Sequence, residues 1–213
     1  MRPSLSAHRC SGCEIRKPLC FFAIIPQLVL QTRVIILMHT CEEVLTTNTA
    51  RLAAKALTNS EVRIHGRRYE RMSSDGLVQP GQTSLLLYPS SRAVELTADF
   101  ASRLSGPVNL IVPDASWRQT KKFVRREPGL VGIPHVTLPP GPPSEYRLRA
   151  QRGDQNLCTL EAIARALGIL ECRTAQAELE TLLRVLVERT LWSRGMLPAG
   201  RCTTAGIPLE AFC

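Results

Sequence analysis

The residues of this chain best suited to chemistry are Asp114, Ser116 and Trp117, which follow a short apolar run. The run 108–112 has the length and composition of a buried strand, and Pro113 turns the chain at its end. A carboxylate just beyond the carboxyl end of a strand lies where open α/β sheets place their binding sites. This pattern predicts a site in which Asp114 acts as the acid or base. In the structural alternative, Asp114 or Ser116 only caps the helix that follows.

A basic helix is predicted directly after this site. Residues 118–126 contain five Lys or Arg side chains and no acid. The cations that we assign to phosphate contacts are Lys121, Lys122, Arg125 and Arg126, and such contacts position a nucleic acid without reading its sequence. The alternative is an ordinary solvated helix face.

The charge and hydropathy of the whole chain restrict its partners. The formal net charge of +9 favours a polyanion, because clustered cations gain affinity by releasing phosphate counterions. An anionic membrane surface is the competing partner. The longest apolar run, 19–25, is far shorter than the roughly 18 residues of a spanning helix. The first residues do not have the pattern of a secretory signal, so we expect no membrane association and a cytoplasmic location.

The order of the predicted elements indicates an α/β fold. A chain of 213 residues with 44% hydrophobic content can form one substantial core and a small appendage. Strands alternate with helices, which predicts a largely parallel sheet with helices on both faces. The predicted strands are 33–38, 62–65, 84–88, 108–112 and 135–138; the predicted helices are 49–57, 92–104, 117–126, 159–167 and 176–192. We divide the chain into a Cys-rich segment (1–30), a catalytic domain (31–195) and a C-terminal tail (196–213).

The Cys-rich segment has half the ligand pattern of a zinc knuckle. Cys10 and Cys13 are separated by two residues, and Cys20 follows after a short loop. A closed structural zinc site needs a fourth ligand, but Phe22 occupies the convenient position. His8 or Cys41 could supply it, and the sequence does not decide between them. Without an export signal, reduced thiols are favoured over a disulfide framework.

Several segments together resemble the DTW-domain family, which includes the tRNA-uridine aminocarboxypropyltransferases. Asp114-Ala115-Ser116-Trp117 resembles the family signature, and the N-terminal cysteines resemble its cysteine-rich lead. The other similar segments are His39 with Glu42, Asn48–Arg51, Leu87–Ser90, and Tyr146–Arg149 leading into Leu157–Ala162. The chain departs from the family at Phe22, where a fourth cysteine is usual, at Cys158, where serine is usual, and at Thr40, where proline is common.

The resemblance implies a fold, a reaction and a substrate. The fold would be similar to the SPOUT class, with a C-terminal knot around the donor. The donor would be S-adenosylmethionine, whose 3-amino-3-carboxypropyl group moves to N3 of a uridine in tRNA and leaves methylthioadenosine.

With this reaction, roles can be assigned to individual residues. Asp114 would remove the N3 proton, because the uridine nitrogen is a poor nucleophile until it is deprotonated. Trp117 would stack on a base, or else pack between helix and sheet. Ser116 would lie at the donor. Arg147 or Arg149 would hold the donor carboxylate or touch RNA phosphate, because an arginine fork suits such groups. Leu157, Cys158 and Thr159 would offer backbone N–H groups to the donor, and Glu161 would contact it or only complete a helix cap.

Two other functions remain open at this level. The first keeps the fold and donor but moves the methyl group, or modifies ribosomal RNA instead of tRNA. The second is a non-catalytic RNA-binding module made of the zinc knuckle and the basic helix.

Overall fold

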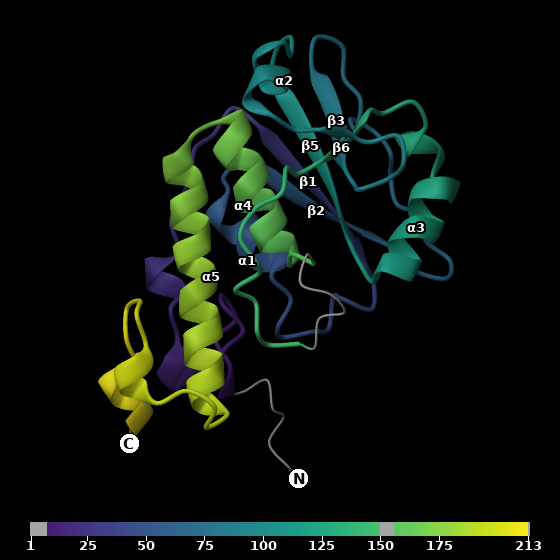
Figure 1. The fold of residues 1–213 in the computed structure, drawn as a ribbon. Helices are drawn as coiled ribbons and strands as arrows, with labels where there is room; N and C mark the ends of the chain where they lie inside the picture. The colour runs from purple at the N-terminus through teal and green to yellow at the C-terminus, as the bar shows by residue number, and fades with distance from the viewer. Residues whose placement is uncertain (1–7, 150–155, 213) are drawn as a thin grey trace.

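A parallel sheet lies between two layers of helices in the computed structural model, which describes residues 8–149 and 156–212 (Figure 1). The sheet order within these residues is β2-β1-β5-β3-β6-β4, and every pairing is parallel. The α/β class and the parallel sheet predicted from the sequence are therefore confirmed. The strands are β1 (Arg33–His39), β2 (Ser60–His65), β3 (Thr83–Leu87), β4 (Val94–Glu95), β5 (Val108–Asp114) and β6 (His135–Thr137).

Alternate side chains of the central strands enter two separate cores. Val34 and Ile36 of β1 face the larger core, which is completed by the helices α1 (Ala50–Ala56), α4 (Thr159–Leu170) and α5 (Arg173–Ser193). Ile35 and Leu37 face the smaller core, which is completed by α3 (Trp117–Arg126) and the 3₁₀ turn η4 (Pro128–Leu130). Figure 1 shows α3 on one side of the sheet and α1, α4 and α5 on the other. A strand buried on both faces reads as a continuous apolar run, as these central strands do.

The predicted helix over 92–104 is wrong in its first half. Val94 and Glu95 form β4, which pairs with Val136 and Thr137 at the edge of the sheet. The helix α2 covers only Ala98–Ser102, and it starts where the Thr97 hydroxyl accepts a hydrogen bond from the Phe100 N–H at 3.1 Å. The edge of β6 offers unpaired backbone groups, and the pairing of β4 with this edge outweighs the local helical pattern.

The C-terminal tail is bound to α5 and to the Cys-rich segment. The Glu188 carboxylate accepts hydrogen bonds from the N–H and hydroxyl groups of both Thr203 and Thr204, at 2.6–3.1 Å. The buried Arg189 guanidinium donates to the carbonyls of Cys20 at 2.7 Å and Gly206 at 3.2 Å. The 3₁₀ turns of these segments are η2 (Lys17–Leu19), η3 (Phe22–Ile24), η5 (Ala199–Arg201) and η6 (Leu209–Phe212).

The carboxyl ends of the strands all lie at one edge of the sheet, because the strands are parallel. Met38, near the end of β1, is in register with Asp114, the last residue of β5. The loops that follow β1, β3, β5 and β6 therefore meet at this edge, which is where doubly wound sheets bind ligands. Over the residues that the structure describes, none of the helices combines the length and apolar character needed to cross a membrane.

Candidate functional site

Asp114 is buried at the end of β5, with 6% of its surface exposed. Its Oδ2 accepts a hydrogen bond from Asn48 Nδ2 at 2.7 Å, and its Oδ1 accepts one from the Thr159 hydroxyl at 2.5 Å. Asn48 precedes α1 and Thr159 opens α4, so three segments distant in the sequence meet at one carboxylate. Asp114 caps no helix in this arrangement, so the helix-capping alternative does not apply to this residue.

Burial is the main influence on the Asp114 carboxyl and raises its pKa above the ordinary value. The hydrogen bonds from Thr159 and Asn48 oppose the effect, as does the charge of Arg149, and the charge of Glu42 adds to it. A carboxylate that is short of solvation holds a proton more readily than one in water. Asp114 therefore accepts a proton more readily than a free aspartate does, which suits a general base.

A second layer of polar groups surrounds this carboxylate. Arg149 donates to Glu42 Oε2 at 3.1 Å and to the Thr47 hydroxyl at 3.1 Å. The Asn48 side chain also reaches Glu42, at 3.4 Å, while its Oδ1 accepts from the Arg51 N–H at 3.0 Å in the first turn of α1. The Asn48 side chain thus caps the first turn of α1 and in addition holds Asp114.

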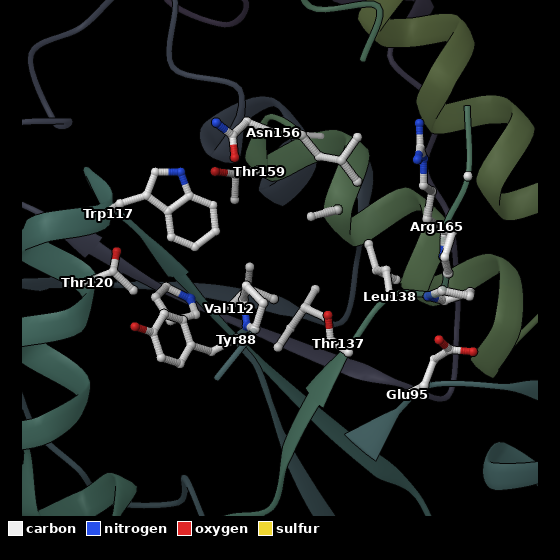
Figure 2. A pocket seen from close by; sticks show the side chains of 18 of the residues that line it. Tyr88, Glu95, Val112, Trp117, Thr120, Thr137, Leu138, Asn156, Thr159 and Arg165 are labelled. Atoms are coloured by element: carbon white, nitrogen blue, oxygen red, sulfur yellow. The ribbon is translucent and has the colours of Figure 1, made fainter. Parts of the chain in front are cut away.

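A cavity of about 550 Å³ opens beside Asp114, within the size range of small-molecule sites. Pro113 and Ala115, the two neighbours of Asp114 in the chain, line it, whereas Asp114 itself does not. Its link to the cavity is Thr159, which lines the cavity and donates a hydrogen bond to the carboxylate. Figure 2 shows Trp117 and Arg165 at opposite ends of the cavity, with Thr159 between them. The other lining residues come from the ends of β3, β4, β5 and β6, the loops after β3 and β6, α3, and α4 with the residues before it: Leu87, Tyr88, Pro89, Glu95, Val112, Thr120, Thr137, Leu138, Pro139, Pro140, Gly141, Pro142, Asn156, Leu157 and Ala162.

Ser90 and His135 hold one wall of the cavity. Tyr88 and Pro89 form this wall, and the Ser90 hydroxyl lies 2.7 Å from His135 Nδ1. Arg92 donates to His135 Nε2 at 2.6 Å, so the ring is neutral and donates from Nδ1 to Ser90. Burial, followed by the charge of Arg92, lowers the pKa of His135 and favours this neutral form.

Trp117 is the first residue of α3 and lies at the mouth of the cavity with 54% of its surface exposed. An indole that packs between a helix and a sheet would be covered, so its exposure favours the stacking role over the packing role. Ser116 instead has the structural role. Its hydroxyl caps α3 by accepting from the Gln119 N–H at 3.4 Å, and Ser116 does not line the cavity.

The loop before α4 divides into lining and supporting residues. Leu157 and Thr159 line the cavity, whereas Cys158 is the N-cap of α4. Glu161 accepts from the Cys158 N–H at 2.9 Å, the Ser144 hydroxyl at 2.6 Å and the Glu145 N–H at 2.7 Å. These contacts match the capping alternative for Glu161.

The arginines do not all lie where the sequence suggested. Arg147 and Arg149 are both exposed, and neither lines the cavity; Arg149 lies in the polar layer beside Asp114. Arg165 lines the cavity, and its Nε has no hydrogen-bond partner among the described residues. Sequence reasoning missed Arg165 because a single cation in an apolar helix looks like a solvated side chain.

The predicted zinc ligands do come together. The sulfur atoms of Cys10, Cys13 and Cys20 lie within 4.8 Å of one another, which fits a three-thiolate ligand set. The aromatic ring of Phe22 lies against Gly12, so closely that a Cβ at Gly12 would be 2.2 Å from the ring. Neither His8 nor Cys41, the two residues considered for a fourth ligand, joins the group.

Known proteins are similar to this chain over most of its length. The family model described as the DTW domain matches residues 7–191. The tRNA-uridine aminocarboxypropyltransferase 2 of Drosophila melanogaster is 27% identical, covering 86% of this chain and 74% of the relative. The protein of the same name from Mus musculus is 31% identical, covering 83% and 60%, and tRNA-uridine aminocarboxypropyltransferase A of Arabidopsis thaliana is 29% identical, covering 84% and 78%. The chain thus spans 60–78% of the length of these relatives. No solved structure matches it.

Proposed function

Because the chain belongs to the DTW-domain family, we propose that it is a tRNA-uridine aminocarboxypropyltransferase. The donor in this proposal is S-adenosylmethionine and the acceptor is N3 of a uridine. The observation that carries the proposal is a buried carboxylate of raised pKa, Asp114, which is hydrogen-bonded to Thr159 in the lining of a cavity of about 550 Å³.

The chemistry requires a base and a positioned electrophile. Asp114 takes the N3 proton of the uridine, and the freed nitrogen lone pair attacks the carbon next to sulfur in the aminocarboxypropyl group. The new N–C bond forms as the C–S bond breaks, and the bonding electrons stay on sulfur, which leaves as neutral methylthioadenosine. Trp117, exposed at the mouth of the cavity, is placed to stack on the uracil while the proton moves.

In this proposal, Arg149 and Arg165 orient the two ends of the donor. The reacting carbon must lie near Asp114, and the carboxylate of the same arm is only a few bonds away. Arg149, whose charge acts on Asp114, therefore stays our candidate for holding that carboxylate, and Arg147 does not. Arg165 lies at the other end, opposite Trp117, where the adenosine would extend. Leu157 and Thr159 would contact the middle of the donor.

We also propose that Cys10, Cys13 and Cys20 hold one zinc ion. Metal-bound thiolates carry negative charge, and the buried Arg189 guanidinium lies close enough for Cys13 and Cys20 to raise its pKa, although burial dominates and lowers it. An ion at this place would stabilise the contact between the Cys-rich segment and α5 and supply no chemistry to the reaction.

We also propose that the fold belongs to the SPOUT class and that the protein is cytoplasmic. The parallel sheet with a cavity at its carboxyl edge supports the SPOUT class. The C-terminal knot belongs to the same proposal. A cytoplasmic location agrees with tRNA as the substrate.

Label transfer tests the function directly. Purified protein is incubated with unmodified tRNA and S-adenosylmethionine labelled either in the methyl carbon or in the aminocarboxypropyl arm, and the nucleosides are analysed by mass. We expect only the arm label in uridine. Transfer of the methyl label would identify a methyltransferase, transfer to ribosomal RNA alone would change the substrate, and binding without transfer would indicate a non-catalytic module.

Replacing Asp114 with Asn supplies the matched control. Asn has the shape of Asp and can keep both hydrogen bonds if the Thr159 hydroxyl reverses its role. We expect transfer to fall about 10²–10⁴-fold, the usual contribution of a general base, with tRNA affinity largely kept. An equal loss of transfer and affinity would show that Asp114 is structural.

A further inference from the structure

We propose that residues 66–74 and α3 form one RNA-docking surface, in which Tyr69 stacks on an unpaired base. We call it the two-segment surface, and its cations are Arg67, Arg68, Arg71, Arg118, Lys121, Lys122, Arg125 and Arg126. The inference rests on the proposed function and extends the RNA contact from one helix to a second, distant segment.

Contacts at both ends hold the segment 66–74 along α3. At its start, the ring of His65 stacks on Phe123 with a centroid distance of 3.7 Å and an interplanar angle of 17°. At its end, the Ser74 hydroxyl donates to Glu127 Oε1 at 2.9 Å, just beyond α3. Between them, Met72 packs against the same small core as Phe123. The segment therefore follows the helix and does not project away from it.

The two segments present their cations to solvent. All eight of these Lys and Arg residues are exposed. Arg67 is paired with Glu43 and Glu70 at 3.1 and 2.9 Å, but the part of the chain that is described shows no ion pair for the cations of α3 or for Arg68 and Arg71. Several exposed cations without an ion-pair partner are the electrostatic pattern of a phosphate-binding surface.

Tyr69 gives the surface a feature that phosphate contacts alone do not need. The residue is 90% exposed, and the Arg68 guanidinium lies 5.3 Å from the ring centroid. An aromatic ring held in water beside an arginine offers a face for a nucleobase, as in proteins that bind single strands.

The position of the surface favours RNA over a lipid membrane. Trp117, the first residue of α3, lies at the mouth of the cavity, so the surface begins where a target base would enter. An RNA whose flanking backbone lies on α3 and on 66–74 could place one base at Asp114. A lipid surface gives no reason for the cations to adjoin the cavity.

Binding of unmodified tRNA tests the surface independently of catalysis. The Asp114→Asn protein serves as the parent, and the dissociation constant is measured by fluorescence anisotropy at several salt concentrations. We expect the double variant Arg68→Ala/Arg71→Ala to weaken binding and to lower the salt slope by about 1.4–1.8, the value for two lost phosphate contacts. The charge-matched control is Arg173→Ala/Arg201→Ala, which removes exposed cations from α5 and η5, away from α3 (Figure 1), and should leave both quantities unchanged.

A second pair of variants isolates the stacking. Tyr69→Ala should weaken tRNA binding about 5- to 150-fold, whereas Tyr69→Phe, which keeps the ring, should bind as the parent does. Unchanged affinity and salt slope in the Arg68→Ala/Arg71→Ala variant would overturn the proposal. It would also be overturned if this variant lost binding to phosphatidylserine vesicles but kept its binding to tRNA. If the wild-type protein transfers no label to tRNA, the proposed function fails, while these binding measurements still decide the surface.

Discussion

Replacing Asn48 with Ala removes hydrogen bonds on both sides of this buried amide. The Asp114 carboxylate loses its donor at 2.7 Å, and the first turn of α1 loses the cap at Arg51 N. Loss of a helix cap costs about 1 kcal/mol, and a buried charged group left without one partner costs about 1.5–3 kcal/mol. We therefore expect the free energy of unfolding to fall by about 2–4 kcal/mol, or Tm by about 5–15 °C for a chain of this size.

The same change should alter the pH dependence of transfer. The hydrogen bond from Asn48 lowers the pKa of Asp114, so its removal raises that pKa and moves the rising limb of the rate profile to higher pH. Asn48→Asp keeps the cap oxygen but places a second carboxylate beside Asp114, and it should move the limb further in the same direction.

Single-turnover rates across pH, together with thermal unfolding, check these expectations. The control is Thr97→Ala, which removes the cap of α2 and should lower Tm without moving the pH profile. A folded Asn48→Asp protein with the wild-type profile would refute the reasoning, because Asp114 could not then be the group that titrates.

Other perturbations test the remaining parts of the structure. Because burial raises the pKa of Asp114, the wild-type protein loses stability as pH rises through that pKa. The Asp114→Asn protein should therefore have a higher Tm than wild type at pH 8, and this difference should disappear by pH 4. A larger difference in acid would contradict the expected direction of the pKa shift. Trp117→Ala should reduce transfer about 5- to 150-fold, while Trp117→Phe keeps most of it; equal rates would exclude stacking. Glu188→Gln should cost about 2–4 kcal/mol and expose the tail to limited proteolysis. Cys20→Ser should lower the zinc content of the purified protein, and unchanged content would remove Cys20 from the ligand set.

The sequence pattern was sufficient to predict the central sheet and the place of its acid. Strands β1 and β5 are buried on both faces, so their apolar runs are unambiguous, and a residue at the end of such a strand must lie at the sheet edge. The position of Asp114 followed from this rule. The pattern failed at 92–104, because β4 is exposed, only two residues long and stabilised by its pairing with β6.

The partners of Asp114 and the wall of the cavity depended on tertiary contacts. Asn48 precedes α1, and a helix cap explains it fully until the fold brings its other amide atom to Asp114. Arg165 has the helical spacing of an ordinary surface residue, and only the packing of α4 over the sheet turns it toward the cavity. Local periodicity contains no information on either contact.

The hydroxyl that Thr159 gives to Asp114 has a consequence for protein synthesis. A ribosome makes Asn48 and Asp114 well before Thr159 and the helix that covers the apolar face of β5. Until that helix emerges, Asp114 would lack the Thr159 hydroxyl and the cover that α4 gives to the sheet. Prematurely terminated chains would then contain Asp114, Ser116 and Trp117 without a completed site.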